Sequence, residues 1–315
     1  MANPKKLFCF GYGYCSDYLS LFLQNHGGWD ISGTTRDPEK QHYLLESGVN
    51  AFFFDKHTPL VDPAQALRGT THILISTPPD DDGDPSFLMH AEDIARVKTL
   101  EWVGYLSATS VYGDKGGAVI NEDAEISPTS KRGSRRVKAE DQWMSLYDDY
   151  HLPLHIFRLS GIYGPGRSAL DSVRAGVARR IEKTGHAFNR IHIDDIIQTI
   201  LASMRQPRPG DVYHLADDYP SPSHEVISYA CELLDIEPPP LIPFEEADMA
   251  PIACSFYKDN KRIDNTKIKQ ELGVKLNHPG YESGLQACLA AEQYAMSMDD
   301  DAEDEEPVQP IENNG

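Results

Sequence analysis

Short apolar runs that end in polar or glycine-rich turns recur through the first half of the chain. They cover residues 7–10, 29–36, 50–54, 72–76, 102–106 and 154–159. Continuous apolar runs of this length are typical of strands that are buried on both faces of a parallel sheet. Segments with helical spacing lie between several of them, such as Tyr18-Leu19 followed by Phe22-Leu23. The pattern predicts an α/β fold with a doubly wound parallel sheet.

The regular alternation of strands and helices breaks down after residue 160. We therefore predict a first, nucleotide-binding domain over residues 1–160 and a smaller domain that occupies most of residues 161–298. A helix over residues 194–204 is expected to return to the first domain. Residues 299–306 contain seven carboxylates and no apolar periodicity, so a disordered acidic tail is predicted for residues 299–315.

Composition narrows the possible partners. The chain has 315 residues, 40% of them hydrophobic, and a formal net charge of −20. Such a charge opposes binding to nucleic acid or to anionic membranes. The sequence contains neither an apolar run long enough to span a membrane nor an apolar leader. The expectation is a cytoplasmic protein that acts on a small molecule.

No metal centre or disulfide framework is predicted. The five cysteines are scattered along the chain, and no two have the C-x-x-C spacing of a zinc site. The acidic loop over residues 80–84 lacks the closing glutamate of a calcium site.

The first apolar run ends in the turn Gly11-Tyr12-Gly13, and a helical pattern begins at Tyr14-Cys15. Glycine lets backbone N–H groups approach a phosphate closely, and a helix N-terminus favours negative charge. The dinucleotide fingerprint has a third glycine where this chain has Ser16. Gly11, Gly13, Tyr14 and Cys15 are predicted to bind the phosphates of a nucleotide. An ordinary strand-to-helix turn is the alternative.

The second strand ends in Thr34-Thr35-Arg36, where dinucleotide folds place an acidic residue on the adenosine ribose. Two hydroxyls and a guanidinium suit a 2′-phosphate instead. We therefore predict that NADP is preferred over NAD; a solvated loop is the competing interpretation of Arg36.

Other strand ends supply further candidates, because ligands of parallel sheets lie beyond the carboxyl ends of the strands. Five residues are predicted cofactor neighbours on this ground: Asp55, Ser76, Thr77, Pro78 and Ser107.

Five segments together resemble the extended short-chain dehydrogenases, the NAD(P)-dependent epimerase/dehydratase family. They are Gly11-x-Gly13, Leu106-Ser107-x-x-Ser110-Val111-Tyr112-Gly113, Arg158-Leu159-x-Gly161-Ile162-Tyr163-Gly164-Pro165-Gly166, Ile191-His192-Ile193-Asp194-Asp195 and Asp264-Asn265-Thr266-Lys267-x-x-x-Glu271-Leu272-Gly273. The resemblance implies a Rossmann domain, a small C-terminal substrate domain, and hydride transfer on nucleotide sugars or related carbonyl compounds.

The resemblance also implies a catalytic Ser or Thr, a Tyr and a Lys, and this chain lacks all three. Their positions hold Ala108, Arg132 and Arg136. Arginine stays protonated and cannot exchange a proton with a substrate hydroxyl. Arg132 and Arg136 are interpreted as anion binders, with a solvated basic face as the alternative. Replacement hydroxyls are sought in Ser107, Thr109 and Ser110, and replacement acids or bases in Tyr112, Tyr163 and His192.

Two functions follow as hypotheses. The first is an oxidoreductase or epimerase of non-standard mechanism that acts on a small anionic carbonyl or sugar-nucleotide-like substrate. The alternative is a non-catalytic NADP(H)-binding redox sensor or scaffold. Only a short helix, about residues 87–97, fits where the family has a longer one that helps to form its dimer interface. A monomer or weak homodimer is therefore predicted.

Overall fold

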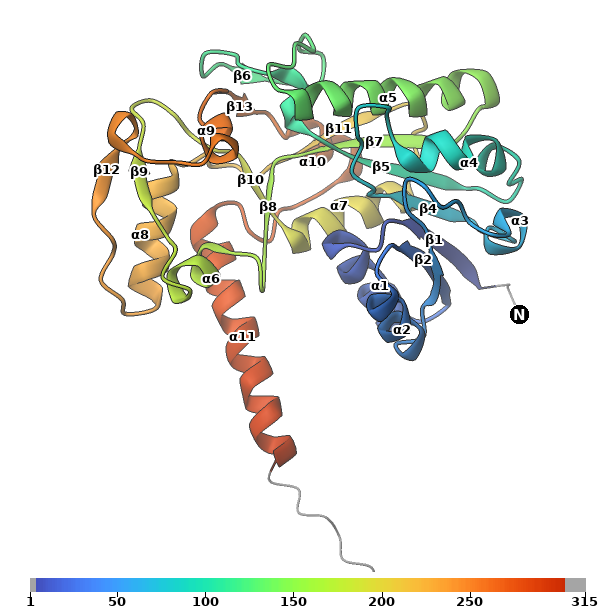
Figure 1. Cartoon of the computed structure of the whole chain (residues 1–315), viewed down its shortest axis with the longest axis horizontal. Coiled ribbons are helices and arrows are strands. Elements are labelled where there is room, and N and C mark those ends of the chain that lie inside the picture. The colour runs from blue at the N-terminus through green and yellow to red at the C-terminus, as the bar shows by residue number, and fades with distance from the viewer. Residues whose placement is uncertain (1–3, 304–315) are drawn as a thin grey trace, which may run out of the picture.

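The computed structural model describes residues 4–303, and the centre of this range is a seven-stranded sheet whose paired strands all run parallel (Figure 1). Its order is β3-β2-β1-β4-β5-β7-β11. The strands are β1 (Lys5–Phe10), β2 (Trp29–Thr35), β3 (Asn50–Phe53), β4 (His72–Ile75), β5 (Trp102–Ala108), β7 (Leu154–Leu159) and β11 (Val212–Leu215). The predicted doubly wound α/β fold is confirmed.

Helices cover both faces of this sheet (Figure 1). One face carries α1 (Tyr14–His26), α2 (Pro38–Glu46), α7 (Ile193–Arg205) and α10 (Thr266–Leu272), whose apolar side chains share one hydrophobic core. The other face carries α3 (Pro63–Ala66), α4 (Pro85–Ala95) and α5 (Lys131–Tyr150), with Trp143 at the centre of a second core. The helices cover the two faces of the sheet and not its carboxyl edge, where doubly wound folds usually bind their ligands.

Three of these helices begin with the same local signal, an aspartate followed by proline. Asp37, Asp62 and Asp84 each accept hydrogen bonds from backbone N–H groups of the first turn of α2, α3 and α4. The next residue is proline in each case, and its missing N–H costs nothing at the first helical position. These helix starts are thus encoded locally, independently of the core.

The chain beyond residue 160 contributes to both parts of the molecule. β11 completes the main sheet, and α7 packs against α1, with Ile193, Ile196 and Ile200 buried in the core that both helices share. The remainder, together with β6 from the first half of the chain, forms short parallel strand pairs and helices beside the sheet (Figure 1). These elements are β6 (Val119–Ile120) with β13 (Arg262–Ile263), β8 (Gly161–Tyr163) with β10 (Arg190–His192), β9 (Arg180–Glu182) with β12 (Leu241–Pro243), α6 (Ala169–Arg174), α8 (Ser223–Leu233), α9 (Pro251–Phe256) and α11 (Tyr281–Glu303).

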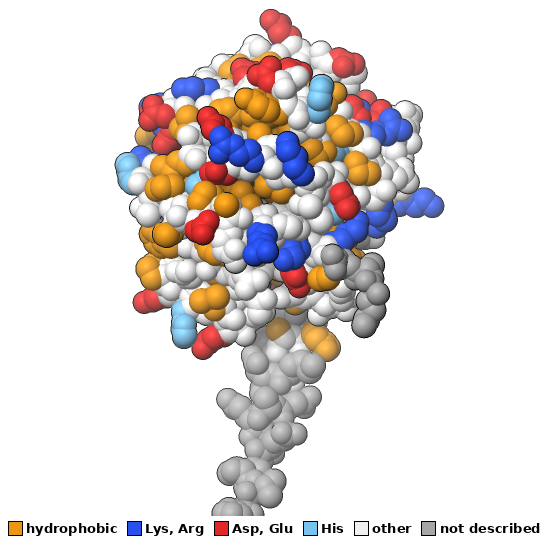
Figure 2. All heavy atoms as spheres, turned by 90° about the vertical axis from the view of Figure 1, so that its right-hand side faces the viewer, with side chains coloured by type: hydrophobic (Ala, Val, Ile, Leu, Met, Phe, Trp, Pro, Cys, Tyr) orange, Lys and Arg blue, Asp and Glu red, His pale blue; other side chains and the backbone are white. Residues whose placement is uncertain are grey.

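The end of the described chain differs from the predicted tail. The backbone of residues 299–303 is the last part of α11 rather than irregular, and residues 304–315 of the predicted acidic tail lie outside the described residues. No helix within residues 4–303 is long and apolar enough to cross a membrane. On the face drawn in Figure 2, basic, acidic and hydrophobic side chains are interspersed.

Candidate functional site

A cleft of about 770 Å³ lies at the carboxyl edge of the sheet, between the sheet and the second part of the chain. It is lined by the glycine turn, the ends of β4 and β5, the start of α5 and loops that follow β7 and precede β10. Of the predicted residues it brings together Gly13, Tyr14, Cys15, Ser76, Pro78, Ser107, Ala108, Thr109, Arg132 and Arg136.

The two glycines of the turn have different roles. Gly11 has a φ of +82°, and a Cβ there would lie 3.0 Å from the backbone nitrogen of Thr77. A Cβ on Gly13 would meet nothing within 4 Å, so this glycine leaves open space beside the cleft. The hydroxyl of Ser16 donates to the Gly11 carbonyl at 3.0 Å. The serine in the third glycine position therefore holds the turn closed.

The residues predicted to select NADP lie outside the cleft lining. Thr34 is buried, and its hydroxyl accepts a hydrogen bond from the backbone N–H of Gly11 at 2.8 Å. Thr35 accepts one from the backbone N–H of Asp37 at 3.1 Å. Arg36 is exposed beyond the end of β2. A second cation, Lys40, lies in the first turn of α2, 5.9 Å from the ring of Tyr12. Sequence reasoning missed Lys40, although its position one helical turn after Arg36 was a usable signal.

Two other predicted cofactor neighbours have structural partners instead. The Asp55 carboxylate accepts hydrogen bonds from the backbone N–H groups of His57 and Thr58, both at 2.8 Å, and these hold its pKa below the usual value. The Thr77 hydroxyl is buried and donates to Asp84 at 3.1 Å. Neither lines the cleft, because each side chain closes its own loop or caps the following helix.

Ser107 connects the cleft to a buried ion pair. Its hydroxyl donates to the carboxylate of Glu140, which comes from α5. Arg158 on β7 grips the same carboxylate with two nitrogens, Nε at 3.1 Å from Oε1 and Nη2 at 2.7 Å from Oε2. Both charged side chains are about 6% exposed. The proton of the serine hydroxyl therefore points into the protein, and its lone pairs are left for a donor in the cleft.

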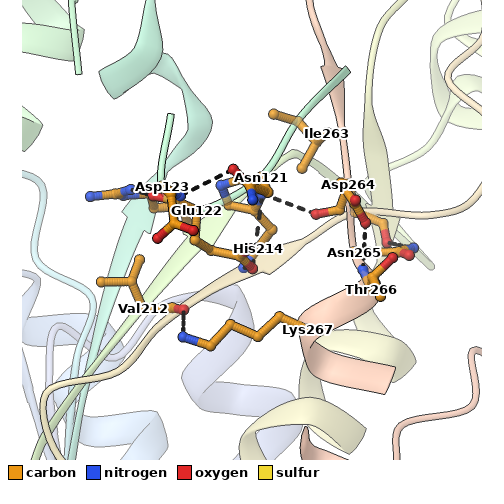
Figure 3. A network of polar contacts seen from close by, with 12 residues as sticks. Asn121, Glu122, Asp123, Val212, His214, Ile263, Asp264, Asn265, Thr266 and Lys267 are labelled. Atoms are coloured by element: carbon orange, nitrogen blue, oxygen red, sulfur yellow. Dashed lines mark hydrogen bonds and ion pairs between the residues drawn. The ribbon is translucent and has the colours of Figure 1, made fainter. Parts of the chain in front are cut away.

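The ion pair is part of a polar network that extends to His214 on β11. Arg158 donates to the hydroxyl of Tyr112, and this hydroxyl lies 2.6 Å from Nε2 of His214. Nδ1 of His214 donates to the Asp264 carbonyl at 3.0 Å, and Glu122 accepts from the His214 backbone N–H at 2.8 Å (Figure 3). Burial lowers the pKa of His214 to about 4 and raises that of Tyr112 to about 12. Both side chains are thus neutral at neutral pH.

Tyr112 and the two other predicted proton carriers lie away from the cleft lining. Tyr163 is buried, and its hydroxyl faces the Gly280 carbonyl at 3.4 Å. His192 is 1% exposed and caps α7 by accepting from the Asp194 backbone N–H at 3.2 Å. The predicted replacements that line the cleft are Ser107, Thr109 and Ser110.

The basic first turn of α5 divides into two pairs. Lys131 and Arg135 form ion pairs with Asp81 at 2.8 and 2.9 Å. Arg132 instead stacks 4.4 Å from the ring centre of Phe256, and Arg136 donates to the Leu106 carbonyl at 2.7 Å. Arg132, Arg135 and Arg136 line the cleft, and Lys131 does not. The carboxylate of Asp81 is therefore the anionic partner of Lys131 and Arg135.

Two further cations that sequence reasoning missed line the cleft. Lys261 is buried and donates to the Gly113 carbonyl at 2.9 Å. Burial lowers its pKa. Arg167 lies 5.6 Å from the ring centre of Tyr14. No local pattern marks either residue, because each reaches the cleft through a long-range contact. The cleft thus gathers positive charge in a protein with a formal net charge of −20.

Comparison with known proteins finds no matching family model. A conserved protein of unknown function from Silicibacter pomeroyi has a solved structure that is 45% identical, with a TM-score of 0.83 over 92% of this chain and 99% of that one. The Escherichia coli K12 protein YeeZ is 24% identical over 286 residues, 87% of this chain and 97% of YeeZ. UDP-glucuronic acid 4-epimerase from Bacillus cereus, solved in complex with NAD, has a TM-score of 0.71 at 16% identity over 92% of this chain and 99% of that one.

Proposed function

We propose that this chain, which belongs to the family of the conserved Silicibacter pomeroyi protein, is an NADP(H)-binding oxidoreductase or epimerase. The proposal also rests on the fold that the chain shares with an epimerase solved in complex with NAD. The substrate proposed for this chain is a small anionic carbonyl compound or a sugar-nucleotide-like molecule. The observation that carries the proposal is one cleft that joins the glycine turn to Ser107 and to Arg132 and Arg136.

The residues present fit a dinucleotide. Gly13 leaves open the space that a phosphate needs, and the first N–H groups of α1 have no acceptor within the helix. The hydroxyl of Ser160 is buried in the cleft lining without a hydrogen-bond partner among the described residues. A ligand in the cleft would supply that partner.

Support for NADP over NAD comes from the end of β2. Arg36 and Lys40 place two positive charges beside the buried Thr34. The carboxylate of Asp37 is turned away, because it accepts hydrogen bonds from the backbone N–H groups of Glu39 and Lys40. A 2′-phosphate would therefore meet cations at this position rather than a free carboxylate.

The chemical half of the cleft supports binding and charge stabilisation. When bound, the nicotinamide would supply or accept a hydride. Arg132 and Arg136 would hold an anionic group of the substrate and stabilise negative charge that develops on its oxygen. Ser107 would accept a hydrogen bond from a substrate hydroxyl, because its own proton is committed to Glu140. Proton exchange then falls to Thr109, Ser110 or water.

A redox sensor is the second candidate. It is favoured by Ala108, Arg132 and Arg136 at the family's catalytic positions and by Tyr112 and Tyr163 lying outside the cleft lining. A sensor must bind the nucleotide but need not convert a substrate. The two candidates therefore share the cofactor and differ in the fate of a substrate.

Calorimetry with NADPH and NADH tests the shared part. We expect NADPH to bind more tightly, and Arg36→Glu to weaken NADPH binding by about 10-fold or more while NADH binding changes little. No binding of either nucleotide would refute both candidates. Consumption of NADPH over a panel of carbonyl compounds and nucleotide sugars, lost in Arg36→Glu, would refute the pure sensor.

A further inference from the structure

Three side chains that can bind a metal meet outside the cleft. His192 ends β10, Asp194 lies in the first turn of α7, and His278 comes from the loop before α11. One donor atom of each lies within 4.8 Å of the other two. We propose that His192, Asp194 and His278 form a binding site for a divalent transition-metal ion of the Zn²⁺ type. The sequence predicts no such site, because His278 lies far along the chain from the other two.

The distances suit a metal of that size. Oδ2 of Asp194 lies 3.5 Å from Nδ1 of His192 and 3.2 Å from Nε2 of His278. Ligand atoms about 2.0–2.2 Å from a tetrahedral zinc ion lie roughly 3.3–3.5 Å from one another. An ion between these three atoms would also take over the lone pair with which Nδ1 of His192 accepts the Asp194 backbone N–H at 3.2 Å. Two imidazoles and one carboxylate are donors that zinc and neighbouring transition metals accept.

The surrounding contacts hold the ligands in place. His192 is 1% exposed, and its Nε2 lies 3.7 Å from the sulfur of Cys288. The carboxylate of Asp195 accepts the backbone N–H groups of Asn277 and His278 at 2.6 and 3.0 Å, which places His278 opposite Asp194. Such outer contacts fix the orientation of metal ligands. The rings of His192 and His278 already lie 4.1 Å apart, centre to centre.

Charge and access also favour a cation here. The carboxylate of Asp194 offsets the positive end of α7, which alone would oppose a cation. Asp194 also lines a second cavity, of about 480 Å³, together with Tyr18 and Gln198. This cavity gives the ion an entry path and room for water as a fourth ligand.

The site would act as a clamp rather than as part of the reaction. None of its three ligands lines the cofactor cleft. His192 and Asp194 belong to the start of a helix packed on the sheet, whereas His278 belongs to the segment that leads into α11. A bound ion would tie these two segments together and stabilise the folded chain.

The test uses the full chain without an affinity tag, stripped with EDTA and titrated with Co²⁺ and then Zn²⁺. We expect one equivalent of Co²⁺ with a visible absorption spectrum of low-symmetry, four-coordinate type, its displacement by Zn²⁺, and a rise in Tm with added metal. Asp194→Asn and His278→Gln should each weaken Co²⁺ binding by more than about 100-fold, beyond the effect of losing an outer contact.

His42→Gln is the matched control, because exposed His42 also pairs with an acidic residue, Glu46 at 3.3 Å. It should leave the stoichiometry and the spectrum unchanged. NADPH calorimetry on each variant separates loss of the metal site from loss of the fold. Absence of Co²⁺ binding to the wild-type chain, or binding that survives in both Asp194→Asn and His278→Gln, would overturn the proposal.

Discussion

One side of the cleft is formed by Gly13, Tyr14 and Cys15, which come from a tight turn and the first turn of α1. On the other side lie Ser107 at the end of β5 and Arg132 and Arg136 from α5. We call these the glycine side and the arginine side. The glycine side owes its shape to local conformation, whereas the arginine side depends on a buried network behind it. The two sides should therefore fail in different ways when residues are changed.

The largest expected effect concerns the ion pair behind the arginine side. Glu140→Gln leaves Arg158 buried without its carboxylate, and loss of one partner of a buried pair costs about 3–5 kcal/mol. Glu101→Gln is the control, because Glu101 is 56% exposed and pairs with Lys5 at 3.3 Å. It should cost less than about 1 kcal/mol. Urea unfolding measures both. Equal costs would show that the network does not support the arginine side.

The next effect depends on pH and involves His214. Its pKa is about 4 in the folded chain, below the ordinary histidine value of 6.5, so the unfolded chain binds more protons between these two values. Its contribution to stability is present above pH 6.5 and is lost as the pH falls toward 4. His214→Gln should destabilise the protein at pH 7.5, and its deficit relative to the wild type should shrink by up to about 2 kcal/mol at pH 5. Urea unfolding at both values checks this.

A pH-independent deficit would show that the pKa of His214 is the same in the folded and the unfolded chain. His155→Gln provides a comparison at a different place in the core. Burial also lowers the pKa of His155 to about 4, but the histidine hydrogen-bonds to Arg208 rather than to the network. His155→Gln should show the same pH dependence as His214→Gln. Combined with Glu140→Gln in a double variant, it should change the free energy of unfolding by the sum of the two single changes.

Substitutions on the glycine side should have smaller effects, on stability at Gly11 and on NADPH affinity at Gly13. Gly11→Ala places a Cβ 3.0 Å from the Thr77 nitrogen at a φ of +82°, and should cost about 1–2 kcal/mol of stability. Gly13→Ala meets nothing within 4 Å and has a φ of −108°, so stability should change by less than about 0.5 kcal/mol. Its Cβ instead fills the space proposed for a phosphate, and NADPH affinity should fall about 10-fold. The reverse pattern would contradict the roles given to the two glycines.

This division also explains what sequence could predict. The strands, the glycine turn and the doubly wound sheet follow from apolar runs and from glycine geometry, which are local properties. Gly13, Tyr14 and Cys15 accordingly lie in the cleft. Asp55 and Thr77 were placed there by the strand-end rule, which does not say which way a side chain turns. Asp55 instead accepts hydrogen bonds from the backbone of its own loop, and Thr77 donates to the carboxylate of Asp84.

The sequence predicted which residues form the arginine side of the cleft. It did not predict the long-range contacts around them. The family resemblance predicts that Ala108, Arg132 and Arg136 stand at the reacting positions, and all three line the cleft. The pairing of Lys131 with Asp81, by contrast, joins the start of α5 to a loop 50 residues earlier in the chain. Lys261 reaches the cleft from the far end of the chain. Such contacts depend on the tertiary fold, and a single sequence carries no local pattern for them.

The smallest expected effect separates two neighbours in the first turn of α5. Arg132 lines the cleft, whereas Lys131 is 71% exposed, outside the cleft lining and paired with Asp81. Arg132→Ala should weaken binding of inorganic pyrophosphate by roughly 3- to 10-fold, as the loss of one partly solvated charged contact does. Lys131→Ala should leave the affinity unchanged, because its charge is already neutralised by Asp81. Calorimetry at two salt concentrations measures both. If the two variants lose affinity equally, pyrophosphate is held by the general basic charge of the helix start and not by the arginine side of the cleft.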